Sequence, residues 1–116
     1  MHFQSAPYAE TKLIRCTAGA VYDVLVDLRP KSPSFRKWAS VEISAQNRKM
    51  VYAPEGVAHG FVTLEDCTEL EYQITPAYAP GSASGVRWND PAFGVEWPRP
   101  PELISERDAA WPLMER

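Results

Sequence analysis

Residues 21–29 read VYDVLVDLR, and this stretch decides the fold class. Side chains alternate between the two faces of a β-strand, so Tyr22, Val24 and Val26 fall on one face. The two aspartates of the stretch, with the leucine between them, fall on the other face and are candidates to line a cavity. Valine and tyrosine favour strands, and Pro30 ends the run because proline cannot donate to a β-ladder. The stretch therefore predicts a β-strand.

Short runs of the same kind recur on both sides of this strand, each bounded by Gly, Pro, Asn or Ser. They predict further strands at residues 12–16, 38–44, 49–53, 57–64 and 68–75. We expect the two strands that flank Gln46-Asn47 to form a hairpin, and the last two strands to form the next pair. The chain shows no amphipathic-helix spacing, and the proline-rich part after Pro76 should wrap over the strands. Together these features predict an all-β fold, an antiparallel sandwich or barrel.

The composition is that of a single globular domain spanning residues 1–116, with 45% hydrophobic and 23% charged residues. A net charge of -3 predicts no general attraction to nucleic acid or to anionic membranes, so an anionic substrate would need a local basic pocket. No apolar run is long enough to span a membrane. Cys16 and Cys67 lack metal-ligand spacing, and two cysteines are few for a small secreted domain. We therefore expect a cytoplasmic protein with reduced thiols and with no nucleic-acid or membrane partner.

Seven runs, in order along the chain, resemble the signature runs of the dTDP-4-dehydrorhamnose 3,5-epimerase family. They are MHFQ (1–4), KLIR (12–15), VYDVLVDLR (21–29), YAPEGVAHGF (52–61), VRWNDP (86–91), VEWP (95–98) and SERD (105–108). Several such runs in register carry far more weight than any one of them alone. The resemblance implies a cupin-type antiparallel β-sandwich, or jelly-roll barrel. It also implies an isomerase that inverts carbons 3 and 5 of a dTDP-linked 4-keto-6-deoxy sugar, in dTDP-rhamnose and cell-surface polysaccharide biosynthesis.

The chemistry that the resemblance implies is proton abstraction next to a carbonyl group. Such a reaction needs a base near neutral pH, a donor for the enolate oxygen and a second proton donor across the ring. The family likeness implies that His2 is the base, Asp108 the carboxylate that orients it, and Tyr72 the proton donor. Without the likeness, His2 would be interpreted as a frayed terminal residue and Asp108 as a solvated acid.

Four further residues match substrate contacts of the family. Lys12 would hold the enolate oxygen or a phosphate, and His59 would contact the sugar. Tyr78 would stack on the thymine, and Arg107 would pair with the diphosphate. The resemblance implies no cofactor. Because the chain has only two histidines and no His-x-His motif, it cannot supply a three-histidine site, and we expect no metal.

The sequence departs from the family pattern in two places. It lacks the Arg-Gly that precedes the Met-His pair and the longer segment before that, so we expect an exposed sheet edge, self-association and almost no activity in this chain alone. The full-length form should be a homodimer. In addition, Ala83 stands where the family commonly has glutamate.

Three hypotheses therefore remain for the function. The first is the 3,5-epimerase, and the second is a related sugar-nucleotide ketoisomerase or mono-epimerase. The third is a degenerate sugar-nucleotide-binding fragment without catalysis, because a fold alone does not determine function. The stereochemistry of the product separates the first two, and uptake of deuterium from solvent separates the third.

Overall fold

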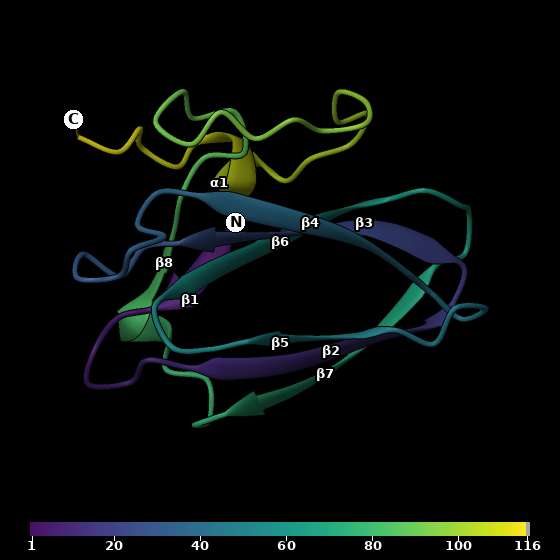
Figure 1. Cartoon of the computed structure of the whole chain (residues 1–116), viewed down its shortest axis with the longest axis horizontal. Helices are drawn as coiled ribbons and strands as arrows, with labels where there is room; N and C mark the ends of the chain where they lie inside the picture. The colour runs from purple at the N-terminus through teal and green to yellow at the C-terminus, as the bar shows by residue number, and fades with distance from the viewer. Residues whose placement is uncertain (116) are drawn as a thin grey trace.

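The computed structural model describes residues 1–115 and folds them into two antiparallel sheets that face each other (Figure 1). The strands are β1 (His2–Gln4), β2 (Thr11–Ala18), β3 (Ala20–Asp27), β4 (Trp38–Ser44), β5 (Met50–Ala53), β6 (Val57–Thr63), β7 (Glu69–Thr75) and β8 (Ala83–Gly85). One sheet has the order β4-β3-β6-β1-β8 and the other the order β5-β2-β7. The all-β prediction is confirmed. In the described part of the chain, no helix is long and apolar enough to cross a membrane.

Strand β3 is buried on both of its faces. On the inner face, Val21 packs between the sheets in a cluster with Ile14 of β2. On the outer face, Val24 and Val26 pack against the C-terminal tail, which contributes Phe93. The tail therefore covers the larger sheet, as predicted, and it can be followed in green and yellow over that sheet in Figure 1. Each fully buried aliphatic side chain of this kind contributes roughly 1.5–3 kcal/mol to folding.

The two predicted strand pairs are wrong. Strand β4 pairs with β3 and β5 with β2, while β6 pairs with β3 and β7 with β2. The chain does turn where expected, and the Asn47 carboxamide oxygen accepts from the backbone N–H groups of Ser44 and Lys49 at 3.0 Å each. After each turn, however, the next strand joins the opposite sheet. Turn residues show where the chain reverses, but long-range packing decides which sheet the following strand joins.

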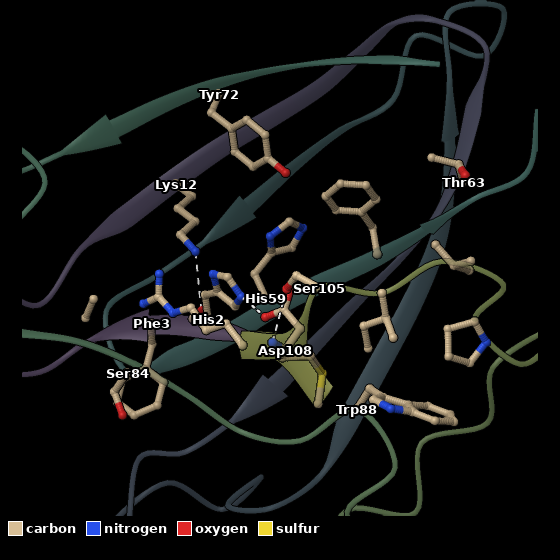
Figure 2. Close-up of a pocket in the computed structure, with 18 of the residues that line it drawn as sticks. His2, Phe3, Lys12, His59, Thr63, Tyr72, Ser84, Trp88, Ser105 and Asp108 are labelled. Carbon is tan, nitrogen blue, oxygen red and sulfur yellow. Dashed lines mark hydrogen bonds and ion pairs between the residues drawn. The ribbon is translucent and has the colours of Figure 1, made fainter. Parts of the chain in front are cut away.

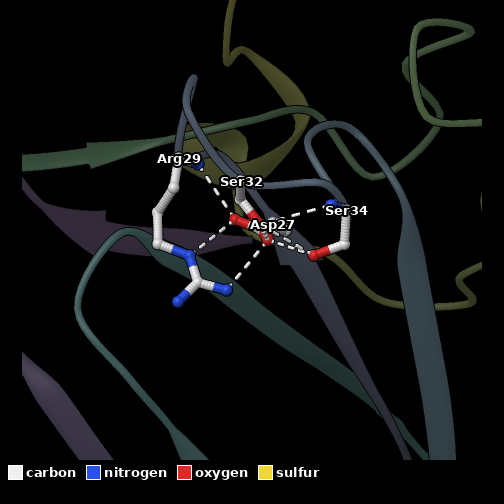
Figure 3. A network of polar contacts seen from close by, with 4 residues as sticks. All are labelled: Asp27, Arg29, Ser32 and Ser34. Atoms are coloured by element: carbon white, nitrogen blue, oxygen red, sulfur yellow. Dashed lines mark hydrogen bonds and ion pairs between the residues drawn. The ribbon is translucent and has the colours of Figure 1, made fainter.

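The loop after β3 closes around the carboxylate of Asp27 (Figure 3). This group accepts hydrogen bonds from the backbone, Nε and Nη2 of Arg29 at 3.0, 2.8 and 2.9 Å, and from Ser32 and Ser34 Oγ at 2.6 and 2.5 Å. The hydrogen bonds from Arg29, helped by those from the serines, outweigh burial and hold the pKa of Asp27 well below its ordinary value. Gly56 has a φ of +77°, and an added Cβ would lie 2.6 Å from Arg29 Cγ. Asp27 therefore organises this loop and does not line the cavity described below.

Strand β1 lies between β6 and β8 and is hydrogen-bonded to both. The register places His2 opposite His59 on one side and opposite Gly85 on the other. Gly60 lies against Met1, and an added Cβ at Gly60 would come within 2.6 Å of Met1 Cγ. His2 is thus held by a sheet and is not a frayed residue.

The one α-helix in residues 1–115 is α1 (Glu106–Ala109), within the tail. Ser105 is its N-cap, and the Ser105 hydroxyl oxygen accepts a hydrogen bond from the backbone N–H of Asp108 at 3.1 Å. Serine is favoured at this position because its side chain satisfies a backbone donor that the helix itself leaves free. The cap therefore fixes the backbone from which the Asp108 side chain extends.

Candidate active site

A cavity of about 650 Å³ opens between the two sheets, with the tail along one side (Figure 2). Small-molecule sites commonly have volumes in this range. Strands β1 and β6 of the larger sheet, β2 and β7 of the smaller sheet, and helix α1 all contribute to its lining. All seven site residues predicted from the sequence line this one cavity: His2, Lys12, His59, Tyr72, Tyr78, Arg107 and Asp108. Their individual roles remain predictions.

His2 and Asp108, 106 residues apart in sequence, meet at the cavity wall. His2 Nε2 and Asp108 Oδ1 form a short hydrogen bond, and the two side chains are 44% and 33% exposed. Burial raises the pKa of the Asp108 carboxyl, but hydrogen bonds from His2, Ser105 and Trp111 and the charge of His2 outweigh it and lower the pKa. Asp108 is therefore a carboxylate at neutral pH. A carboxylate at Nε2 favours the tautomer with its proton on Nε2, which leaves Nδ1 free to accept a proton.

His59 forms a second, buried pair with Asp23. His59 Nε2 lies 2.6 Å from Asp23 Oδ1, and the two side chains are 3% and 0% exposed. Asp23 lies opposite Phe61 in the β3–β6 register, so it sits diagonally from His59 on the same sheet face. The other carboxylate oxygen, Oδ2, has no hydrogen-bond partner among the described residues. Asp23 was not assigned to the site from the sequence, although a carboxylate on this largely apolar strand was a signal.

Tyr72 extends from β7 into the cavity from the smaller sheet, across from His2 and Asp108 (Figure 2). Its ring meets that of His59 edge to face, with 6.0 Å between the ring centroids. Burial, together with the negative charge of Asp23, raises the pKa of the Tyr72 phenol well above its ordinary value. Tyr72 is therefore a neutral phenol at physiological pH and carries a proton on its oxygen.

Lys12 lines the cavity, and its side chain is buried and ion-paired. Its Nζ lies 3.2 Å from Glu10 Oε1, and each of these side chains is 8% exposed. The same ammonium donates to the backbone carbonyl of His2 at 3.3 Å. Glu10 was not predicted from the sequence, even though residues two apart on an extended chain share a face. Lys12 thus places an ammonium group on the cavity wall, and Glu10 offsets part of the charge of that group.

Tyr78 and Arg107 are exposed lining residues of the cavity. Tyr78 is 63% exposed. The neighbouring Ala79 donates its backbone N–H to the side-chain oxygen of buried Gln4 at 2.8 Å, which ties this segment to β1. Arg107 Cζ lies 5.2 Å from the centroid of the Trp111 ring, in a cation–π contact. An aromatic ring and a guanidinium are thus available where an anionic, partly aromatic ligand could contact them.

Among residues 1–115, no three His, Cys, Asp or Glu side chains gather as metal ligands would. Both histidines are hydrogen-bonded to aspartates. The cavity presents an imidazole oriented by a carboxylate, a neutral phenol on the opposite wall and an ammonium group. Such groups can take a proton from a carbon next to a carbonyl and return one from the other side.

The fold and the cavity together define a cupin-type β-sandwich with a ligand-sized cavity between its sheets. The chain belongs to the dTDP-4-dehydrorhamnose 3,5-epimerase family, whose model matches residues 1–116. It is 48% identical to the dTDP-4-dehydrorhamnose 3,5-epimerase of Salmonella typhimurium over 118 residues, which cover 100% of this chain and 64% of that relative.

Two solved structures show the same likeness. The dTDP-4-dehydrorhamnose 3,5-epimerase of Bacillus anthracis, with TDP and PPi bound, superposes with a TM-score of 0.94 at 42% identity and covers 97% of this chain and 65% of its own. The dTDP-6-deoxy-D-glucose-3,5-epimerase of Legionella pneumophila, in complex with dTDP-4-keto-L-rhamnose, gives a TM-score of 0.91 at 35% identity, with 97% and 60% covered. The chain thus spans less than two thirds of the length of each of these three relatives.

Proposed function

We propose that this chain carries the acid–base centre of a dTDP-4-dehydrorhamnose 3,5-epimerase. The reaction converts dTDP-4-dehydro-6-deoxy-D-glucose into dTDP-4-dehydro-L-rhamnose, a step of dTDP-rhamnose and cell-surface polysaccharide biosynthesis. One observation carries the proposal: the carboxylate-bound His2 faces Tyr72 across a single cavity in a chain of this family. A base and an acid on opposite walls are what inversion of a carbon centre requires.

In the proposed mechanism, Nδ1 of His2 removes the proton from a carbon next to the C4 keto group. The electron pair of the broken C–H bond moves into the ring, and the negative charge gathers on the keto oxygen. The Lys12 ammonium stabilises that enolate oxygen, in the manner of an oxyanion site, and His59 contacts the sugar. Tyr72 then donates its phenolic proton to the carbon from the opposite face, which inverts the centre. Carbons 3 and 5 both flank the keto group, so the same groups serve both inversions.

Substrate binding is assigned to the exposed residues of the cavity. Arg107 would pair with the diphosphate, since a guanidinium offers several donors to phosphate oxygens. Tyr78 would stack on the thymine base. Ala83 also lines the cavity but offers no polar side chain, so the substrate would lack one contact there.

The proposal includes a cytoplasmic location and a homodimer. Cys16 and Cys67 are both free thiols, in keeping with a reducing compartment. Strand β7 lies at the edge of the smaller sheet, and nearly all of its residues are exposed. An uncovered strand edge can pair with another chain. These features support the homodimer and the cytoplasmic location. Light scattering of the purified protein would test the first, and cell fractionation would test the second.

The proposal is tested by incubating the protein with dTDP-4-dehydro-6-deoxy-D-glucose in D₂O and following the sugar by NMR. We expect deuterium at carbons 3 and 5 and inversion at both. Inversion at one carbon only would make the protein a mono-epimerase, and a keto group moved along the ring would make it a ketoisomerase. Binding of dTDP without any deuterium uptake would overturn the catalytic proposal and leave a binding module.

A further inference from the structure

The indole of Trp111, which follows helix α1, contacts three residues of the proposed site. Its Nε1–H donates to Asp108 Oδ1 at 3.2 Å, the same oxygen that meets His2. Its ring stands edge-on to the His2 imidazole, with 6.0 Å between centroids and an interplanar angle of 74°. The Arg107 guanidinium lies over its face. No feature of the sequence singled out this tryptophan.

Gly85 leaves the space that the Trp111 indole occupies. It lies on β8, directly opposite His2 in the strand register. A Cβ added at Gly85 would come within 2.3 to 2.7 Å of three indole atoms, which is too close for the ring to stay in place. The missing side chain therefore lets the indole lie against the strand beside the proposed base.

We propose that Trp111 is a positioning residue, which holds Asp108 and His2 in the arrangement that proton transfer needs and Arg107 where it can pair with the diphosphate; this inference rests on the proposed function. The indole N–H fixes the orientation of the Asp108 carboxylate, and the ring edge limits rotation of the half-exposed His2 imidazole. The ring face anchors the Arg107 guanidinium. Positioning of this kind raises a rate without any contact between Trp111 and the reacting carbon, because proton transfer is sensitive to small displacements of the base.

The first test is Trp111→Phe, which keeps an aromatic ring and removes the N–H donor. We expect kcat for deuterium uptake to fall about three- to tenfold, as for the loss of one neutral hydrogen bond, with a smaller change in KM. The pKa of Asp108, followed through its carboxyl carbon by ¹³C NMR, should rise because one of its donors is gone. Trp38→Phe is the matched control, since Trp38 packs against the core cluster, and it should change neither quantity. An unchanged Asp108 pKa together with an unchanged kcat would overturn the inference.

The second test displaces the indole without altering it. Gly85→Ala should shift the indole N–H resonance of Trp111 and lower kcat by a similar factor. In a Trp111→Phe background the smaller ring leaves room for the added methyl group. Gly85→Ala should therefore lower kcat much less in that background than in the wild type, which is the signature of two coupled residues. If the two effects on kcat simply multiply, Trp111 does not transmit the effect of Gly85. If Trp111→Phe does not fold, the indole N–H resonance of Trp111 is measured in Asp108→Asn instead. This resonance must shift, because the hydrogen-bond acceptor of the indole has changed, and an unshifted resonance would overturn the inference.

The outcome separates this inference from the proposed function. If Asp108→Asn leaves deuterium uptake at the wild-type rate, the proposed base is wrong, and the inference fails with it. If Asp108→Asn is strongly impaired while Trp111→Phe matches the wild type, the proposed function stands and only the role of Trp111 is refuted.

Discussion

Replacing Asp108 by asparagine removes one charge from the proposed base pair and keeps the shape of the side chain. The carboxylate accepts from His2 Nε2 and from Trp111 Nε1 at one oxygen. An asparagine can rotate its amide NH₂ toward His2, and Nε2 must then become the acceptor. The imidazole proton would move to Nδ1, the nitrogen that has to accept a proton from the sugar. The substitution therefore changes the tautomer as well as the charge.

The size of the effect follows from the exposure of the pair. A hydrogen bond to a charged group contributes about 1.5–3 kcal/mol, and solvent weakens the charge term because the side chains are 44% and 33% exposed. The lower end of that range corresponds to about tenfold in rate. The wrong tautomer adds to this, up to the roughly 10²–10⁴-fold that a lost general base costs. We expect Asp108→Asn to reduce kcat by about 10- to 10³-fold, between these limits.

The assay is the initial rate of deuterium uptake at carbons 3 and 5, measured by proton NMR in D₂O at saturating substrate. Binding of dTDP, measured by calorimetry, should change little, because Asp108 is assigned to proton transfer and not to the nucleotide. Glu106→Gln is a matched control, since it removes one carboxylate charge from the same helix at an exposed position. Wild-type uptake in Asp108→Asn would refute the reasoning, as would an equal loss in Glu106→Gln.

Three further predictions concern Tyr72, Lys12 and Asp27. Tyr72→Phe should still exchange deuterium, through His2 alone, but product with inverted centres should form about 10²–10⁴-fold more slowly; equal losses of exchange and of inversion, compared by NMR, would contradict this. Lys12→Met leaves Glu10 buried without its partner and should cost about 3–5 kcal/mol of stability in urea unfolding, whereas adding Glu10→Gln should restore stability but not activity. Asp27→Asn should lower the free energy of unfolding by about 1.5–3 kcal/mol at pH 7, with kcat unchanged. Because the pKa of Asp27 in the folded protein is depressed, this loss of stability relative to the wild type should be full above about pH 4 and should shrink as the pH falls further. A stability difference that grows in acid would refute the prediction.

The sequence predicted the strands far better than their pairing. The alternation around Val24 depends on local side-chain chemistry, so it is visible along a single stretch. Pairing depends on which sheet a strand joins after a turn, and the turn at Asn47 looks the same in a hairpin and in a connection between sheets. The two aspartates of β3 show a related limit. They share a strand face, yet Asp23 pairs with a cavity histidine whereas Asp27 closes a loop, because their partners come from other parts of the chain.

The site could be predicted only through the resemblance to the family. The likeness pointed to His2, Tyr72 and Asp108, and the fold brings them to one cavity. Trp111 and Glu10 were not found. The contacts of Trp111 depend on the path of the tail, which no motif marks, whereas the two-residue spacing of Glu10 and Lys12 was a signal that both could face the cavity.

The most direct test of the account is deuterium uptake by His2→Ala, beside the wild type, on the same dTDP-linked 4-keto-6-deoxy sugar. His2 is assigned as the one group that removes protons from both carbons. We therefore expect uptake at carbons 3 and 5 to fall together by at least about 10²-fold, with the fold intact by circular dichroism and dTDP still bound. Uptake at the wild-type rate at either carbon would contradict the account.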